Sequence, residues 1–117
     1  DYLDMSLWDV FKQPMDESLQ GRSLWSIFNA LERGEVRVGM AGKIMSAADA
    51  QRCLEDGADF VTIGRAAILR HDYPKRVVAD PGYQSPALPV TAEHLRAEGL
   101  GPAFLDYMRS WKGFVAD

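Results

Sequence analysis

Two short loops in the sequence combine glycine with a basic residue. The first is Ala41-Gly42-Lys43 and the second is Gly64-Arg65. Glycine has no Cβ, so its backbone N–H can come close to a bulky anion. Arginine adds a permanently charged fork of donors, and a helix starting after Gly64 would point unsatisfied N–H groups the same way. This chemistry suits a phosphate group, and we predict that the glycines admit it while Arg65 neutralises it.

A strand is predicted directly before each loop. Residues 36–40 (VRVGM) and 59–64 (DFVTIG) are short, apolar and rich in β-branched side chains. Between them, Ser46 with Asp49 three residues later predicts a capped helix that Gly57 ends. This order implies a parallel strand pair, whose carboxyl ends lie side by side about 5 Å apart at the backbone. The two loops should therefore meet.

The flanking residues continue the same alternation. Residues 1–6 (DYLDMS) alternate apolar and polar side chains as a strand does. Residues 23–34 place apolar side chains at helical spacings of three and four, with Ser23 as the N-cap and Gly34 as the end. The resulting order of strands and helices predicts an α/β fold with a parallel sheet.

The pattern changes from Pro74 onward, where prolines become frequent, and Pro81, Pro86 and Pro89 indicate an irregular connection. Thr91 is expected to cap one helix, and Pro102 to start another. We therefore divide the chain into a sheet-containing part, residues 1–73, and a helical extension, residues 74–117, that packs on it. Four aromatic residues at helical spacings are predicted to be core: Trp25, Phe104, Tyr107 and Trp111.

Charge, hydropathy and cysteine content argue against several classes of function for this chain. The 13 basic and 17 acidic residues give a net charge of −4, which does not favour a nucleic-acid partner. No apolar run approaches the roughly 20 residues that span a bilayer, and the first residues are acidic, so we expect a cytoplasmic protein without membrane attachment. Cys53 has no second cysteine and is predicted to be a buried thiol, while His71 should lie at the surface and His94 is given no role. A structural zinc site is not expected.

Residues 36–78, VRVGMAGKIMSAADAQRCLEDGADFVTIGRAAILRHDYPKRVV, resemble the end of the barrel in the Old Yellow Enzyme family, the NADH:flavin oxidoreductases that bind FMN. The resemblance extends more loosely back to DYLDMS and forward to YMRSWKGFV. It implies that the chain is the C-terminal fragment of a (β/α)8 TIM barrel. Residues 1–6, 36–40 and 59–64 would be strands six, seven and eight, and a helical C-terminal extension would follow.

The resemblance also implies a cofactor site. The FMN phosphate would be held by Gly42, Gly64 and Arg65, with the backbone amides of Ala41 and Lys43 as helpers. The parent enzyme would pass hydride from NADH or NADPH through FMN to a small-molecule acceptor such as an electron-poor alkene. The family's substrate-binding histidines and proton-donating tyrosine lie on earlier strands that this sequence does not contain. No catalytic residue is therefore expected here, and the fragment alone should be inactive. Met5, Ser6 and Trp8 end the first strand on the active-site side, where they would either contact flavin or substrate or pack in the core.

Two other interpretations remain. Residues 57–67 (GADFVTIGRAA) also resemble dihydrouridine synthase, and another phosphate-binding TIM barrel would fit as well, although the acidic balance argues against an RNA substrate. Alternatively, an incomplete barrel would self-associate, because strands meant to be buried would leave apolar faces and open edges.

Overall fold

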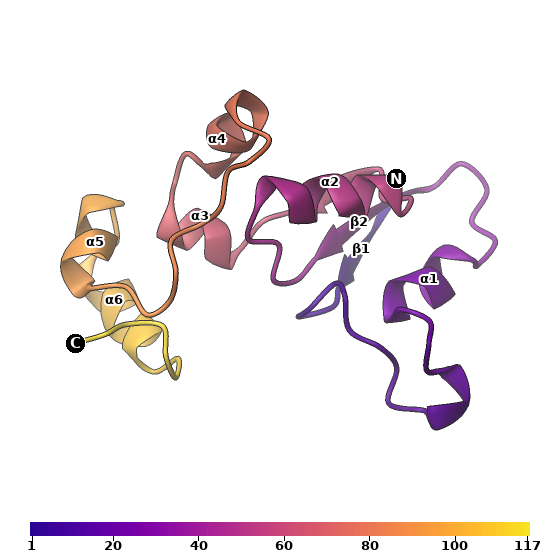
Figure 1. Cartoon of the computed structure of the whole chain (residues 1–117), viewed down its shortest axis with the longest axis horizontal. Coiled ribbons are helices and arrows are strands. Elements are labelled where there is room, and N and C mark those ends of the chain that lie inside the picture. The colour runs from indigo at the N-terminus through magenta and orange to yellow at the C-terminus, as the bar shows by residue number, and fades with distance from the viewer.

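A computed structural model describes all 117 residues as a mixed α/β chain (Figure 1). Its strands are β1 (Tyr2–Ser6), β2 (Arg37–Ala41) and β3 (Phe60–Thr62). They form one parallel sheet in the order β1-β2-β3. The predicted α/β class and parallel sheet are confirmed. The helices are η1 (Glu17–Leu19), α1 (Leu24–Asn29), α2 (Ala47–Glu55), α3 (Arg65–Leu69), α4 (Tyr73–Ala79), α5 (Ala92–Ala97) and α6 (Pro102–Arg109).

The predicted helix starts are confirmed. The side chains of Ser23, Ser46 and Thr91 each accept a hydrogen bond from a backbone N–H in the first turn of the helix that follows. The pair of Ser46 and Asp49 forms a complete capping box at α2. These local signals work because each cap needs only residues within one turn.

The end of α1 was predicted incorrectly. The helix stops at Asn29 and does not continue to Gly34, although Gly34 does adopt a positive φ of 57° in the turn beyond. The guanidinium of Arg33 donates to the Asn29 carbonyl, so a side chain satisfies that acceptor in place of a further helical turn. Leu31 is exposed, so no core contact favours a longer helix.

The helix α4 was not predicted from the sequence, which indicated an irregular connection only around Pro81, Pro86 and Pro89. Pro74 occupies the first turn of α4, where its missing N–H removes no helical hydrogen bond. Arg76 also pairs with Asp72, the N-cap residue, at 2.8 Å. The expected boundary between residues 73 and 74 falls inside this helix.

Two separate hydrophobic cores hold the chain together. The first lies between one face of the sheet, α1 and α2, and consists of Leu7, Val10, Trp25, Val38, Met40, Ile44, Ala50, Cys53 and Ala58. The second joins α3 to α5 and α6, and consists of Leu69, Val90, Ala92, Leu95, Leu105, Met108 and Phe114. Figure 1 shows α5 and α6 at the opposite end of the molecule from α1. The sheet with α1 and α2 forms one packed unit, and α5 and α6 form another; α3 and α4 link the two units.

The four predicted core aromatics divide between inside and outside. Trp25 is buried in the first core, as predicted. Phe104 and Tyr107 are exposed, because Leu105 and Met108 on the opposite side of α6 face the second core. Their two rings stack on each other at the surface instead. Trp111 is only half-buried, and its position is described with the site below.

The molecule exposes more surface than a compact domain of its size. Its accessible surface is 7635 Å², against about 6,300 Å² expected for a folded 13 kDa monomer. Its radius of gyration is 16.0 Å, against about 13 Å expected for 117 residues. The second face of the sheet is uncovered, with Tyr2, Asp4 and Arg37 exposed on it. No helix has the length and apolar character needed to cross a membrane.

Candidate anion-binding site

A cavity of about 250 Å³ lies where the three parallel strands end. All five residues predicted to hold a phosphate line it: Ala41, Gly42, Lys43, Gly64 and Arg65. The remaining lining residues are Ser6, Trp8, Ile44, Met45, Thr62, Ile63, Ile68 and Trp111. The parallel order of the strands therefore brings the two loops together as expected. Whether these residues bind phosphate stays a prediction.

Gly42 has a structural reason to be glycine. Its φ is 140°, and a Cβ there would lie 2.6 Å from the carbonyl carbon of Trp8 and 2.8 Å from the backbone nitrogen of Asp9. The segment after β1 packs directly on this loop, since Leu7 and Val10 donate backbone hydrogen bonds to the carbonyls of Ala41 and Gly42. The close approach that we predicted for a ligand is thus made here by the chain's own backbone.

Gly64 is different. It precedes α3 with a φ of −108°, and a Cβ built on it would meet no atom within 4 Å. The missing side chain is therefore not needed for packing within the chain. It keeps this part of the cavity open, so Gly64 is the glycine whose small size a ligand would use.

Backbone donors are free on both loops. The N–H groups of Gly42, Lys43 and Gly64 donate to no other group of the chain. In contrast, the N–H groups of Met45 and Ser46, further along the chain, both donate to the carboxylate of Asp49. The helix α3 has only five residues, so few peptide dipoles align in it. Any attraction of the cavity for anions must come mainly from these loop donors and from the basic side chains.

The two basic side chains at the cavity retain hydrogen-bonding capacity. Arg65 donates from Nη2 to the Trp8 carbonyl at 2.7 Å and lies 4.8 Å from the centre of the Trp8 ring. This contact uses one of the five N–H donors of the guanidinium. Lys43 lies 3.7 Å from a carboxylate oxygen of Asp9, with 60% of its side chain exposed. Because Lys43 is exposed and the separation is long, this pair is weak and Lys43 can exchange Asp9 for another anion.

Two tryptophans form an aromatic side of the cavity. Trp8 adopts a positive φ of 64° and is 63% exposed. Its ring lies 5.7 Å from that of Trp111, centre to centre, and the two planes are tilted by 33°. Trp111 comes from the segment after α6, so the C-terminal helical unit contributes to the cavity. The helical spacing predicts Trp111 in the core, and no local sequence pattern indicates this long-range contact.

The other residues considered at the end of β1 behave differently. Ser6 and Trp8 line the cavity, and a contact of theirs with flavin or substrate stays a prediction. Met5 packs against the first core, as its alternative interpretation predicted. In β1 neighbouring side chains alternate between the two faces of the sheet, which explains why Met5 and Ser6 separate.

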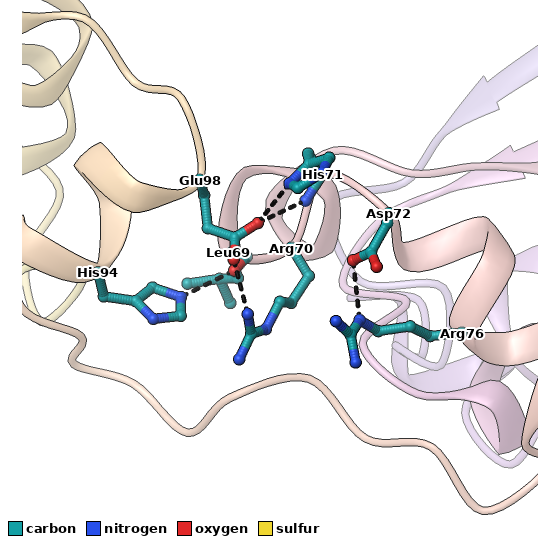
Figure 2. Close-up of polar contacts among 7 residues, drawn as sticks. All are labelled: Leu69, Arg70, His71, Asp72, Arg76, His94 and Glu98. Atoms are coloured by element: carbon teal, nitrogen blue, oxygen red, sulfur yellow. Dashed lines mark hydrogen bonds and ion pairs between the residues drawn. The ribbon is translucent and has the colours of Figure 1, made fainter.

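A second charged cluster lies between α3, α4 and α5 (Figure 2). The carboxylate of Glu98, only 6% exposed, accepts hydrogen bonds from the Arg70 guanidinium at 2.7 Å and from both the backbone and the ring of His71, at 3.0 and 2.7 Å. Burial alone would raise the pKa of Glu98, but these donors outweigh it and lower the pKa below its ordinary value. His94 binds the Leu69 carbonyl at 2.8 Å across the same boundary. We call this group the junction cluster.

Three residues in and beside the junction cluster carry groups that could bind a metal ion. Side-chain ligand atoms of His71, Asp72 and Glu98 lie within 4.8 Å of one another. Both carboxylates, however, already pair with arginines, Glu98 with Arg70 and Asp72 with Arg76. Their arrangement is accounted for by contacts that join α4 and α5 to α3. His71 is exposed at the surface, as expected.

Cys53 is the only cysteine, and the structure places it in the first core. Its side chain is fully buried. Burial raises the pKa of the thiol to about 11, with a further contribution from the carboxylates of Asp49 and Asp56. A thiol of this pKa is almost entirely protonated near neutral pH, so it is a poor nucleophile. The prediction of a buried thiol is confirmed.

The chain was compared with family models, curated proteins and solved structures. No family model, no curated protein and no solved structure matches the chain.

Proposed function

We propose that this chain binds the phosphate of FMN and forms the C-terminal part of an FMN-dependent NAD(P)H oxidoreductase of the Old Yellow Enzyme type. One observation carries the proposal. Two loops that are 22 residues apart in sequence, at Gly42 and Gly64, line one cavity together with Lys43 and Arg65. Three backbone N–H groups there donate to no other group of the chain, and no acidic residue lines the cavity.

The residues present fit a phosphate group. Arg65 offers charged donors, Lys43 offers a second positive charge, and the open side of Gly64 gives an anion access to the backbone. The cavity volume of about 250 Å³ is smaller than the roughly 300 to 1,000 Å³ of sites that enclose a whole ligand of this kind. This site would hold the phosphate and the adjoining part of the sugar chain, and the flavin ring would extend beyond it.

In this proposal the residues of the chain bind and orient the cofactor. Bound FMN would supply the hydride transfer between NAD(P)H and a small-molecule substrate. No side chain of this chain is assigned a catalytic role. The parallel order β1-β2-β3 supports reading these strands as six to eight of a TIM barrel, because phosphate sites in that fold follow strands seven and eight.

The first test is the substitution Arg65→Ala, with Arg96→Ala as the matched control. Arg96 is exposed on α5, makes no side-chain hydrogen bond or ion pair and does not line the cavity, so Arg96→Ala removes the same charge outside the site. Calorimetric titration with FMN and with inorganic phosphate should show binding weakened by about 1 to 3 kcal/mol in Arg65→Ala, the range for charge-assisted hydrogen bonds. Arg96→Ala should bind as the unaltered chain does. Equal affinities in all three proteins would contradict the proposal.

A second test uses Gly64→Ala. Because a Cβ at residue 64 meets no protein atom within 4 Å, the added methyl group should leave folding intact. It should weaken FMN binding if the phosphate approaches the backbone at this point. Quenching of tryptophan fluorescence by FMN provides the readout, since Trp8 and Trp111 line the same cavity. Unchanged FMN affinity in a folded Gly64→Ala protein would place the ligand elsewhere.

The exposed surface favours a second candidate, self-association of the chain. The sheet has unpaired edges at β1 and β3 and one uncovered face, and the total surface exceeds that of a compact monomer. Two copies could pair through these edges or faces. Sedimentation with and without FMN separates the candidates: a monomer that binds FMN supports the cofactor site alone, and a dimer indifferent to FMN supports assembly alone.

A further inference from the structure

A row of aromatic side chains leads from the anion-binding cavity along α6. Trp8 and Trp111 line the cavity, and their ring centres lie 5.7 Å apart. Tyr107 follows Trp111 at 5.9 Å, and Phe104 follows Tyr107 at 5.7 Å. We call these four residues the aromatic row. It connects the proposed phosphate site with the surface of the C-terminal helical unit.

The aromatic row is accessible from solvent. Trp8 is 63% exposed, and Phe104 and Tyr107 are 45% and 52% exposed. The second core is already filled on the other side of α6 by Leu105 and Met108. Phe104 and Tyr107 are three residues apart, so they lie next to each other on the surface of the helix. A continuous group of exposed aromatic side chains is typical of a binding surface, whereas single exposed apolar residues are common everywhere.

The size of the aromatic row favours a small planar group over a protein partner. A stable protein interface uses about 20 to 30 residues on each side, and the row has four. Exposed aromatic side chains instead bind planar rings well, in offset or edge-to-face contacts. The row begins at the phosphate site, where the Arg65 guanidinium lies over the Trp8 ring. Its position therefore suits a ligand that carries both a phosphate and an aromatic ring.

We propose that the aromatic row is the subsite for the flavin ring of an FMN molecule whose phosphate occupies the anion-binding cavity. This inference rests on the proposed function and names the residues that would hold the ring. The cavity holds the phosphate and the adjoining sugar chain, and the ring lies beyond it. Arg65 covers part of Trp8, so Trp111 and Tyr107 provide most of the contact with the ring. Because both belong to the C-terminal helical unit, one ligand contacts both packed units of the chain.

FMN, ribose 5-phosphate and inorganic phosphate are the probes that test this proposal. Ribose 5-phosphate keeps a phosphate on a sugar and lacks the ring. Calorimetric titration of the full chain should show FMN binding at least about tenfold more tightly than ribose 5-phosphate, because stacking on aromatic side chains contributes a factor of this order. The three-way comparison separates the contribution of the ring from that of the phosphate.

Two variants locate the contribution of the ring. Tyr107→Ala and Trp111→Leu should each weaken FMN binding about fivefold and leave the binding of inorganic phosphate unchanged. Leucine at residue 111 keeps an apolar side chain against the second core, on which Trp111 packs. Tyr2→Ala is the matched control, because Tyr2 is also an exposed tyrosine that packs edge-to-face on another ring, that of Phe60, and it lies outside the row. Its FMN affinity should equal that of the unaltered chain.

The outcomes separate this inference from the proposed function. If phosphate binds and FMN binds no more tightly than ribose 5-phosphate, the ring subsite is refuted while the phosphate site stands. The subsite is also refuted if the preference for FMN survives in both variants, or if they alter only sedimentation, as expected for a surface that joins two copies. If neither FMN nor phosphate binds, both proposals fail. Circular dichroism verifies folding; should Trp111→Leu fail to fold, Tyr107→Ala decides alone, because Tyr107 lies at the surface.

Discussion

The anion-binding site and the junction cluster use similar residues in opposite ways. In the junction cluster, the Glu98 carboxylate is nearly buried and accepts three hydrogen bonds of 2.7 to 3.0 Å. At the anion-binding site, Lys43 has only the half-buried carboxylate of Asp9 at 3.7 Å, and Arg65 binds a neutral carbonyl. Charged groups whose partners are already in place stabilise the fold. Charged groups with free donors facing a cavity are available for a ligand.

The two regions also differ in what holds them in place. The junction cluster joins α3 and α4 to α5 through side chains. The anion-binding site is held by the backbone, because the segment after β1 packs on Gly42. Substitutions should therefore affect stability and binding differently in the two regions.

The largest effect is expected for Gly42→Ala, at the backbone contact beneath the anion-binding site. The new methyl group would overlap the Trp8 and Asp9 backbone and would force alanine into a positive φ. We expect a loss of about 2 to 5 kcal/mol of folding free energy, from overpacking and an unfavourable backbone conformation together. Urea denaturation followed by circular dichroism measures it. Gly64→Ala is the matched control, with little change in stability; similar losses in both variants would show that the two loops do not differ as described.

Glu98→Gln should have the next largest effect, at the centre of the junction cluster. Glutamine keeps the shape but removes the charge that Arg70 and His71 contact. We expect a loss of about 1 to 3 kcal/mol, the range for hydrogen bonds to a charged group. Glu93→Gln, on the exposed side of the same helix, is the control and should change stability little. FMN affinity should be unaltered in both. Unchanged stability in Glu98→Gln would mean that the junction does not depend on this charge.

The features that sequence reasoning predicted are local or follow from strand order. The capping box of Ser46 and Asp49 needs one helical turn, and the meeting of the loops at Gly42 and Gly64 follows from parallel strands. Contacts between distant segments could not be predicted. Neither the packing of Trp8 on Gly42 nor the position of Trp111 has a local pattern, because both depend on how whole units fold back.

The length and the existence of short helices were also difficult to predict from the sequence. The length of α1 is set by Arg33 satisfying the Asn29 carbonyl, which competes with a further turn that the apolar spacing favoured. No helix was predicted at α4, although Pro74 suits the first turn of a helix. The Asp72–Arg76 pair was the available sequence signal for that helix, since acidic and basic residues four apart support helical structure.

The junction cluster should also make stability depend on acidity. The pKa of Glu98 is lowered in the folded chain from its ordinary value of 4.5, so folding favours the charged carboxylate. The stabilisation is then present above pH 4.5 and is lost as the pH falls through the lower folded pKa. Asp72, whose pKa is lowered by Arg76, changes stability in the same direction. Thermal unfolding between pH 3 and pH 7 should show a steeper decline for the unaltered chain than for Glu98→Gln; parallel curves would contradict the assignment.

The smallest effect concerns the weak pair at the anion-binding site. Asp9→Asn removes the negative charge 3.7 Å from Lys43, while the amide oxygen can still accept the hydrogen bond that Asp9 receives from the Phe11 backbone. Exposed pairs of this kind contribute at most about 1 kcal/mol, so folding should change little. Phosphate binding should become up to about fivefold tighter, because Lys43 is released and a repulsive charge is removed. The increase should shrink at high salt, since these charges are exposed to solvent.

Asp106→Asn, which removes an exposed carboxylate from α6, is the control. Weaker phosphate binding in Asp9→Asn would mean that Asp9 positions the site, and the contrast between a fully paired junction cluster and an available anion-binding site would then fail at Lys43.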